Sequence, residues 1–171
     1  MTPIAEKQAG LSDRTRHGRA INAAAEHFRT KLSVPNIYIE PRLSGSEIDL
    51  LAVDRAGSGD LHAVEVKIPN LFVSSLSNLR AYVARLKDWP AHFRYLVLPD
   101  VPKTVEMLSK LQLFSSDGIG RVGILLVREA GSGLPQIETA VQPERYRVPE
   151  SAMDKVEKFL ARRRPDIETR I

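Results

Sequence analysis

Two short runs of alternating apolar and charged residues, joined by a glycine-rich loop, constrain the fold of this chain more than any other feature. The runs span residues 47–54 and 61–67, and the loop between them contains Gly57, Ser58 and Gly59. Alternation with a period of two predicts strands, and a loop of this composition predicts that they form a hairpin. Because alternate residues of a strand share a face, the hairpin would separate a charged face from an apolar one.

The flanking segments predict a mixed α/β domain. Helical spacing of apolar residues predicts helices at residues 12–31, 74–89, 103–114 and 149–163. Compact apolar runs predict further strands at residues 36–43, 93–98, 123–127 and 137–141. The order α-β-β-β-α-β-α-β-β-α is typical of an α/β domain with an antiparallel start. We expect a flexible leader over residues 1–11 and a single domain over residues 12–171, in which helices flank a mixed central sheet.

The composition is that of a soluble globular protein, with 43% hydrophobic and 27% charged residues among 171. No apolar run reaches the roughly eighteen residues of a membrane span, and no charged-then-apolar leader opens the chain, so we expect no membrane partner. Cysteine is absent, which excludes disulfides and thiolate metal sites and fits a cytoplasmic location. The net charge of +4 suits a polyanionic partner without requiring one.

The polar face of the predicted hairpin carries the residues with chemical potential. Glu65 and Lys67 share one face of the second run, and Glu47 and Asp49 share one face of the first. The residues expected on the opposite, core-facing side are Ile48, Leu50, Val64 and Val66. A turn centred on residues 57–59 would place Asp49 opposite Lys67, with Glu65 one diagonal step away. Sheltered charges in such a group are costly unless something neutralises them.

A divalent cation would remove that cost. Mg²⁺ prefers oxygen ligands, and Asp49 and Glu65 provide carboxylates while the carbonyl of Val66 is placed to add a third oxygen. Such a metal lowers the pKa of a bound water and neutralises charge that builds up on a phosphate. Lys67 would orient or deprotonate the water or stabilise the phosphorane, and the pattern leaves these roles open. The pattern predicts a Mg²⁺ or Mn²⁺ site with Asp49, Glu65 and Lys67 as catalytic residues.

Asp49 followed by Glu65-x-Lys67 across a hairpin, after a helix that carries Glu26, resembles the PD-(D/E)XK or restriction-endonuclease-like nuclease superfamily. The αβββαβ core of that family matches the elements predicted over residues 12–98. The resemblance implies metal-dependent hydrolysis of phosphodiester bonds, in DNA more often than in RNA. Ile48 precedes Asp49 where the name of the motif has proline, a variation that this divergent family tolerates.

The resemblance also implies roles for residues outside the hairpin. Many members have a glutamate on the first helix as a further metal ligand, and Glu26 stands at that place. Some exonuclease-like branches carry Gln-x-x-x-Tyr on the next helix, which Asn78 and Tyr82 resemble with Asn in place of Gln. These two residues would then contact substrate. A plain surface role for Glu26, and a capping or packing role for Asn78 and Tyr82, stay open.

Basic residues near the N-terminus and on the second predicted helix are candidates for holding a nucleic-acid backbone. Residues 14–19 read Arg-Thr-Arg-His-Gly-Arg, and we expect Arg16 and Arg19 to contact phosphates in salt-sensitive, largely sequence-independent binding. The same role is open to Arg80, Arg85 and Lys87. The four histidines lack metal-ligand spacing and are interpreted as surface or satisfied residues, although His17 lies within the basic segment: His17, His27, His62 and His92.

Two other functions remain open at this level. One is a catalytically silent module that keeps the nuclease fold and binds nucleic acid or a protein partner. The intact acidic and lysine positions argue against it, because a degraded site is expected to lose at least one of them. The other is a nuclease that works only with a partner chain, so that a homodimer or a separate subunit supplies sequence specificity.

Overall fold

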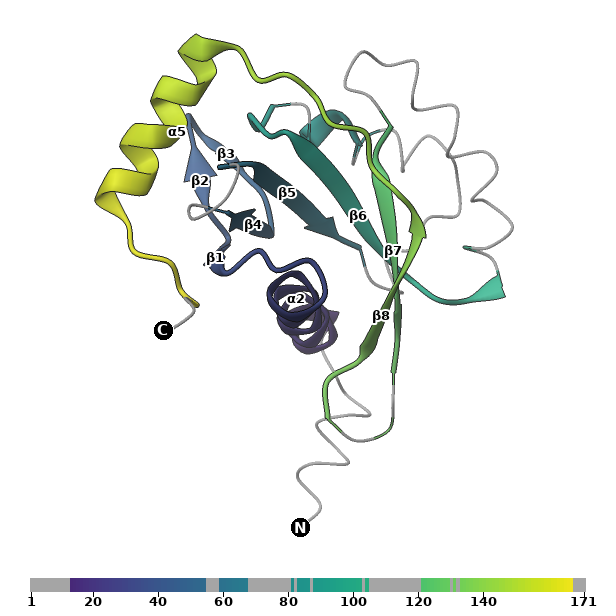
Figure 1. Cartoon of the computed structure of the whole chain (residues 1–171). Coiled ribbons are helices and arrows are strands. Elements are labelled where there is room, and N and C mark those ends of the chain that lie inside the picture. Colours follow the sequence, from purple (N-terminus) through teal and green to yellow (C-terminus); the bar gives the residue numbers. More distant parts are fainter. Residues whose placement is uncertain are drawn as a thin grey trace.

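The computed structural model describes residues 13–54, 59–67, 81, 83–86, 88–102, 104, 121–129, 131 and 133–167 (Figure 1). Its helices and strands follow in the order α2 (Asp13–Thr30), β1 (Asn36–Ile39), β2 (Arg42–Leu43), β3 (Ser46–Glu47), β4 (Leu50–Val53), β5 (Leu61–Val66), β6 (Phe93–Pro99), β7 (Gly123–Arg128), β8 (Gln136–Val141) and α5 (Glu150–Arg162). The leader and most of the helices predicted at 74–89 and 103–114 lie outside these residues. None of the described helices is long and apolar enough to cross a membrane.

A mixed sheet of six strands forms the centre of the molecule, in the order β1-β4-β5-β6-β7-β8 (Figure 1). The first three strands pair antiparallel, β5, β6 and β7 pair parallel, and β8 returns antiparallel to β7. Strands β2 and β3 form a separate two-stranded ribbon. This architecture confirms the predicted α/β fold, in which helices flank a mixed central sheet.

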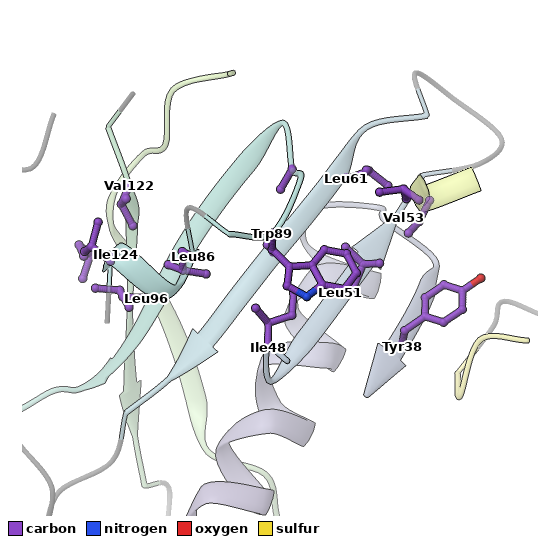
Figure 2. Packing of buried hydrophobic residues seen from close by; sticks show 14 of the residues in the cluster. Tyr38, Ile48, Leu51, Val53, Leu61, Leu86, Trp89, Leu96, Val122 and Ile124 are labelled. Atoms are coloured by element: carbon purple, nitrogen blue, oxygen red, sulfur yellow. The ribbon is translucent and has the colours of Figure 1, made fainter. Parts of the chain in front are cut away.

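Both faces of the sheet are buried, each against its own hydrophobic cluster. Helix α2 contributes Ile21 and Phe28 to the cluster on one face. Helix α5 and the helical residues 83–86 contribute to the cluster on the other face, where Trp89 lies over the sheet (Figure 2). Strand β6 reads as a continuous apolar run because its alternate residues enter different clusters.

The expected alternation of side chains breaks at Asp49. Ile48 packs with Leu51 and Trp89 in one cluster, whereas Leu50 packs in the cluster under α2 on the opposite face (Figure 2). The prediction that Ile48 and Leu50 share a face is therefore wrong. The reason is that residues 48 and 49 lie between β3 and β4 rather than inside one continuous strand, so the period of two is interrupted there.

The register of the β4–β5 hairpin differs by two residues from the predicted one. Leu50 pairs with Val64, which places Asp49 level with Glu65 rather than with Lys67. The turn is closed by the amide of Gly59, which donates to the carbonyl of Asp54 at 2.7 Å. Gly59 has a positive φ of 76°, which glycine adopts without a steric penalty. The shift brings the two carboxylates closer together than the sequence predicted.

Candidate active site

A pocket of about 350 Å³ opens where the chain leaves the C-terminal end of β5. It brings together the three predicted catalytic residues, Asp49, Glu65 and Lys67. The ribbon of β2 and β3 forms one wall and a helical residue forms another, and the full lining is Gly45, Ser46, Glu47, Ile48, Asp49, Glu65, Lys67 and Arg85. Three carboxylates and two cations therefore converge on one small space.

Glu65 is the most deeply buried of these charged residues, with 3% of its surface exposed. Its position on β5, in register with Leu96 of β6, sets it into the apolar sheet. Burial and, to a smaller extent, the charge of Asp49 raise the pKa of Glu65 to about 7, against the opposing effect of Lys67. The ammonium of Lys67 lies 3.4 Å from Oε2 of Glu65. A cation placed here would stabilise the ionised carboxylate.

Asp49 is held in place by the backbone of the neighbouring strand. The amide of Val66 donates to Oδ2 of Asp49 at 2.7 Å, and the carbonyl of Asp49 accepts from the amide of Glu40 at 2.9 Å. The backbone of Lys67 is fixed in a similar way, since its amide donates to the carbonyl of Val97 at 2.9 Å. The backbone that carries Asp49 and Lys67 is therefore fixed by hydrogen bonds, which positions their side chains.

His17, which was not predicted as a site residue, is not among the lining residues of the pocket but contacts Asp49, which is. Its Nε2 lies 3.1 Å from the carbonyl oxygen of Val66 and 3.4 Å from Oδ2 of Asp49. The hydrogen bond with Asp49 raises the pKa of His17, while partial burial lowers it, and the net direction is upward. A signal was present, because His17 continues the buried stripe of α2 that includes Ala20 and Ile21, at helical spacing.

Glu26 lies apart from the other predicted ligands. It follows His17 by nine residues on α2, which corresponds to about two and a half turns and a rise of about 13 Å, so it points to the opposite side of the helix. Half of its side chain is exposed, and Oε2 accepts from Nη1 of Arg29 at 3.3 Å. The geometry gives no support to the predicted role of Glu26 as a metal ligand.

Of the predicted substrate-binding residues, the structure describes Arg16 and Arg19, and neither lines the pocket. Arg19 donates to Oε2 of Glu129 at 3.1 Å and to the carbonyl of Gly133 at 3.0 Å, which ties α2 to the connection between β7 and β8. Arg16 is partly buried and does not line the pocket. Asn78 and Tyr82 lie outside the described residues.

The donor set of the pocket suits a hard divalent cation. Among the described residues no three side chains of His, Cys, Asp or Glu are arranged as a complete metal-binding group. Asp49 and Glu65 offer carboxylate oxygens and Val66 offers a carbonyl, and water and substrate oxygens would complete the coordination, as is usual for Mg²⁺. The buried Glu65, with its raised pKa, is the group that such an ion would relieve most.

Comparisons with known proteins give information on the fold of the chain but none on its chemistry. No protein-family model and no curated protein sequence matches the chain. Among solved structures, SPO1766, a protein of unknown function from Silicibacter pomeroyi, aligns with a TM-score of 0.55 at 13% identity, over 85% of this chain and 84% of that one. SfsA from Pyrococcus furiosus, solved in complex with Ca²⁺, aligns with a TM-score of 0.38 at 17% identity, over 72% and 62%. The chain therefore shares its fold with SPO1766.

Proposed function

We propose that this chain is a metal-dependent phosphodiesterase of the PD-(D/E)XK type that hydrolyses nucleic acid, with DNA as the first substrate to test. The observation that carries the proposal is the convergence of Asp49, Glu65 and Lys67 in one pocket, with the pKa of Glu65 raised to about 7. Perturbed carboxylates in a cleft are typical of functional sites rather than of surface charge. Helix α2, the β1–β4–β5 meander, the helical residues 83–86 and β6 follow one another along the chain, an order compatible with the αβββαβ core of that family.

Each residue has a distinct role in this proposal. Asp49, Glu65 and the carbonyl of Val66 would hold Mg²⁺ or Mn²⁺, which supplies an activated water and offsets charge on the phosphate. Lys67, beside Glu65, orients that water and stabilises the negative charge that develops during attack. Most of the rate enhancement would come from the fixed positions of these groups.

His17 takes the place on the first helix that the family resemblance assigned to Glu26. Its Nε2 approaches both the Val66 carbonyl and Asp49, two of the three oxygen donors of the proposed site. In its neutral form the imidazole adds a nitrogen donor, which suits Mn²⁺ better than Mg²⁺. We therefore propose His17 as the fourth protein ligand and Mn²⁺ as the preferred ion.

A catalytically silent module that binds nucleic acid or a protein is the second candidate. It is favoured by one observation, the lack of a complete three-side-chain metal group among the described residues. In that case the contact between His17 and Val66 would be a permanent structural hydrogen bond rather than a ligand position waiting for an ion.

Cleavage assays with matched variants separate the two candidates. Labelled single- and double-stranded DNA and RNA are incubated with Mg²⁺, Mn²⁺ or EDTA, using the wild type, Lys67→Ala, Glu65→Gln and Glu157→Gln. Glu157 is an exposed carboxylate on α5 outside the pocket and serves as the control. We expect metal-dependent cleavage that Lys67→Ala and Glu65→Gln abolish and Glu157→Gln retains. Absence of cleavage and of metal binding in the wild type would favour the silent module.

A further inference from the structure

Arg85 is the arginine among the described residues that lines the pocket. Half of the arginines in the described part of the chain are paired with a carboxylate: Arg19, Arg29, Arg42, Arg121, Arg128, Arg145 and Arg163. The side chain of Arg85 is exposed, lines the pocket, and forms no ion pair with any carboxylate of the described residues. Its charge acts on Glu65 only through space, where it lowers the pKa of that carboxyl slightly against the effect of burial.

The backbone that carries Arg85 is fixed on both sides. Its neighbours Val83 and Leu86 are buried in the hydrophobic cluster next to Trp89 (Figure 2). The carbonyl of Leu86 accepts from Nε of Arg94 at 2.9 Å, and Arg94 also donates to the carbonyls of Trp89 and Ala91. Arg94 is itself buried, so this clamp is protected from water. A pre-organised backbone lowers the entropy lost when the Arg85 guanidinium binds a ligand.

The wall facing Arg85 is tied to the same clamp. Nε1 of Trp89 donates to the carbonyl of Ser46 at 3.1 Å, and Ser46 belongs to the ribbon that forms the other side of the pocket. Arg94 holds the carbonyl of Trp89 at 2.9 Å. Hydrogen bonds through Trp89 and Arg94 therefore connect the ribbon to the helical residues that carry Arg85.

The charges of the pocket suit a phosphate group. A guanidinium presents donors in a planar fork that matches two phosphate oxygens, which Lys67 with its single ammonium does not. Lys67 is also engaged by Glu65 at 3.4 Å, so Arg85 is the cation of the lining with the greater freedom to bind an anion. The described residues of the lining are charged, small polar or aliphatic, and none of these described residues is aromatic.

We propose that Arg85 binds a substrate phosphate at the pocket, so that this residue recognises the backbone of the nucleic acid. This inference rests on the proposed function and names the substrate feature that the site reads. It predicts binding without sequence preference, since contacts to phosphate position a nucleic acid but carry no sequence information. Arg85 would then be a substrate-binding residue, distinct in role from Lys67.

The test is a salt titration of binding rather than of cleavage. Anisotropy of a labelled oligonucleotide is measured in Ca²⁺ from low to moderate salt, with the wild type, Arg85→Ala, Arg85→Lys and the control Arg162→Ala. Arg162 is exposed on α5, outside the pocket. Arg85→Ala should weaken binding about tenfold and reduce the slope of log Kd against log salt by roughly 0.7–0.9, the contribution of one phosphate contact. Arg85→Lys should restore most of the slope but only part of the affinity.

The possible outcomes separate this inference from the proposed function. If Arg85→Ala and Arg162→Ala give the same affinity and the same salt slope, the inference about Arg85 is wrong even where the wild type cleaves. If the wild type binds none of the oligonucleotides, both proposals are overturned. A uniform loss of affinity in Arg85→Ala without any change in slope would indicate a structural role and would also overturn the inference. Circular dichroism melting of each variant confirms that the fold is retained.

Discussion

Charged residues lie at both ends of β5, but the charges are paired with matching groups at one end and leave a carboxyl with a raised pKa at the other. At the N-terminal end, Arg145 donates to Oδ1 of Asp60 at 2.9 Å, and Nδ1 of His92 accepts from the amide of Leu61 at 2.9 Å. Burial lowers the pKa of His92, which keeps the ring neutral and lets this nitrogen act as an acceptor. Each polar group at this end therefore has a partner of matching chemistry.

At the C-terminal end the charges do not balance in this way. Glu65 is buried beside the charge of Asp49, although the ammonium of Lys67 lies 3.4 Å from Glu65 and Nε2 of His17 lies 3.4 Å from Asp49. The pKa of Glu65 is consequently raised to about 7. Polar groups that are fully satisfied stabilise a fold, whereas an unbalanced group is retained where a ligand completes it. The difference between the two ends supports our proposal that the site lies at the C-terminal end of β5.

The largest expected effect follows from Asp49→Asn. The amide side chain keeps an oxygen that accepts from Val66 but loses the charge that would hold a metal ion. We expect cleavage to fall by about two to three orders of magnitude, comparable with the loss of a main electrostatic group in other enzymes. Calorimetry should show weakened Mn²⁺ binding, while thermal melting shows an intact fold. If Asp49→Asn cleaves at a rate within a few fold of that of the wild type, the proposed functional difference between the two ends of β5 is wrong.

Glu65→Gln tests the same difference between the two ends of β5, through the free energy of unfolding measured in EDTA. The pKa of Glu65 lies above its ordinary value of 4.5, so the folded protein retains a proton that the unfolded chain releases. Stability should therefore fall as pH rises from about 4.5 to about 7 and then level off, with a total loss of up to about 3 kcal/mol. The variant removes the ionisable group and should lose this part of the pH dependence.

Urea unfolding of the wild type and Glu65→Gln at several pH values measures this effect. The two curves should meet near pH 4 and separate towards neutral pH, where the variant is the more stable. Addition of Mn²⁺ should reverse the order, because only the wild type then gains from bound metal. Parallel curves over the whole range would show that Glu65 is not the source of the pH dependence.

His17→Gln should have an intermediate effect, and it addresses the choice of metal. The variant loses the imidazole nitrogen beside Val66 and Asp49 but keeps a polar side chain at the same point of α2. We expect affinity for Mn²⁺ to fall by about tenfold and affinity for Mg²⁺ to change less, since imidazole is a poor ligand for Mg²⁺. Metal titrations monitored by calorimetry measure both. An equal loss for the two ions would remove His17 from the ligand set.

Much of this arrangement was predictable from the sequence, and the exceptions have physical causes. The shared face of Glu65 and Lys67 follows from strand periodicity, which needs no knowledge of the rest of the molecule. The register of the hairpin depends on where the turn closes, at Asp54 and Gly59, and a glycine-rich loop allows several closures. Helical spacing places His17 on the buried face of α2, but its partner Val66 lies 49 residues further along the chain, and no local spacing names that partner.

The hydrogen bonds from Arg94 to the backbone likewise could not be predicted from the sequence. A buried arginine that donates to three main-chain carbonyls has no signature in the sequence, because its partners are backbone atoms of any residue type. For Glu26, the family resemblance and the helical phase disagree. The family resemblance gave it a role from its position before the hairpin, but the helical phase relative to the buried stripe of α2 would have placed it on the exposed side. Helical phase is therefore the better guide to which residue of α2 reaches the site.

The smallest expected effect belongs to Asp60→Asn at the opposite end of β5. The substitution removes the charge that pairs with Arg145, whose side chain is 54% exposed. Ion pairs with one exposed partner contribute little, so we expect a loss of stability below about 1 kcal/mol and no change in cleavage or metal affinity. Asp60 is also the charge that raises the pKa of His92 against the effect of burial, so the variant should lower that pKa further, which NMR titration of the ring detects. A loss of cleavage in Asp60→Asn as large as that in Asp49→Asn would show that the two ends of β5 act together, and the division between a structural and a functional end would fail.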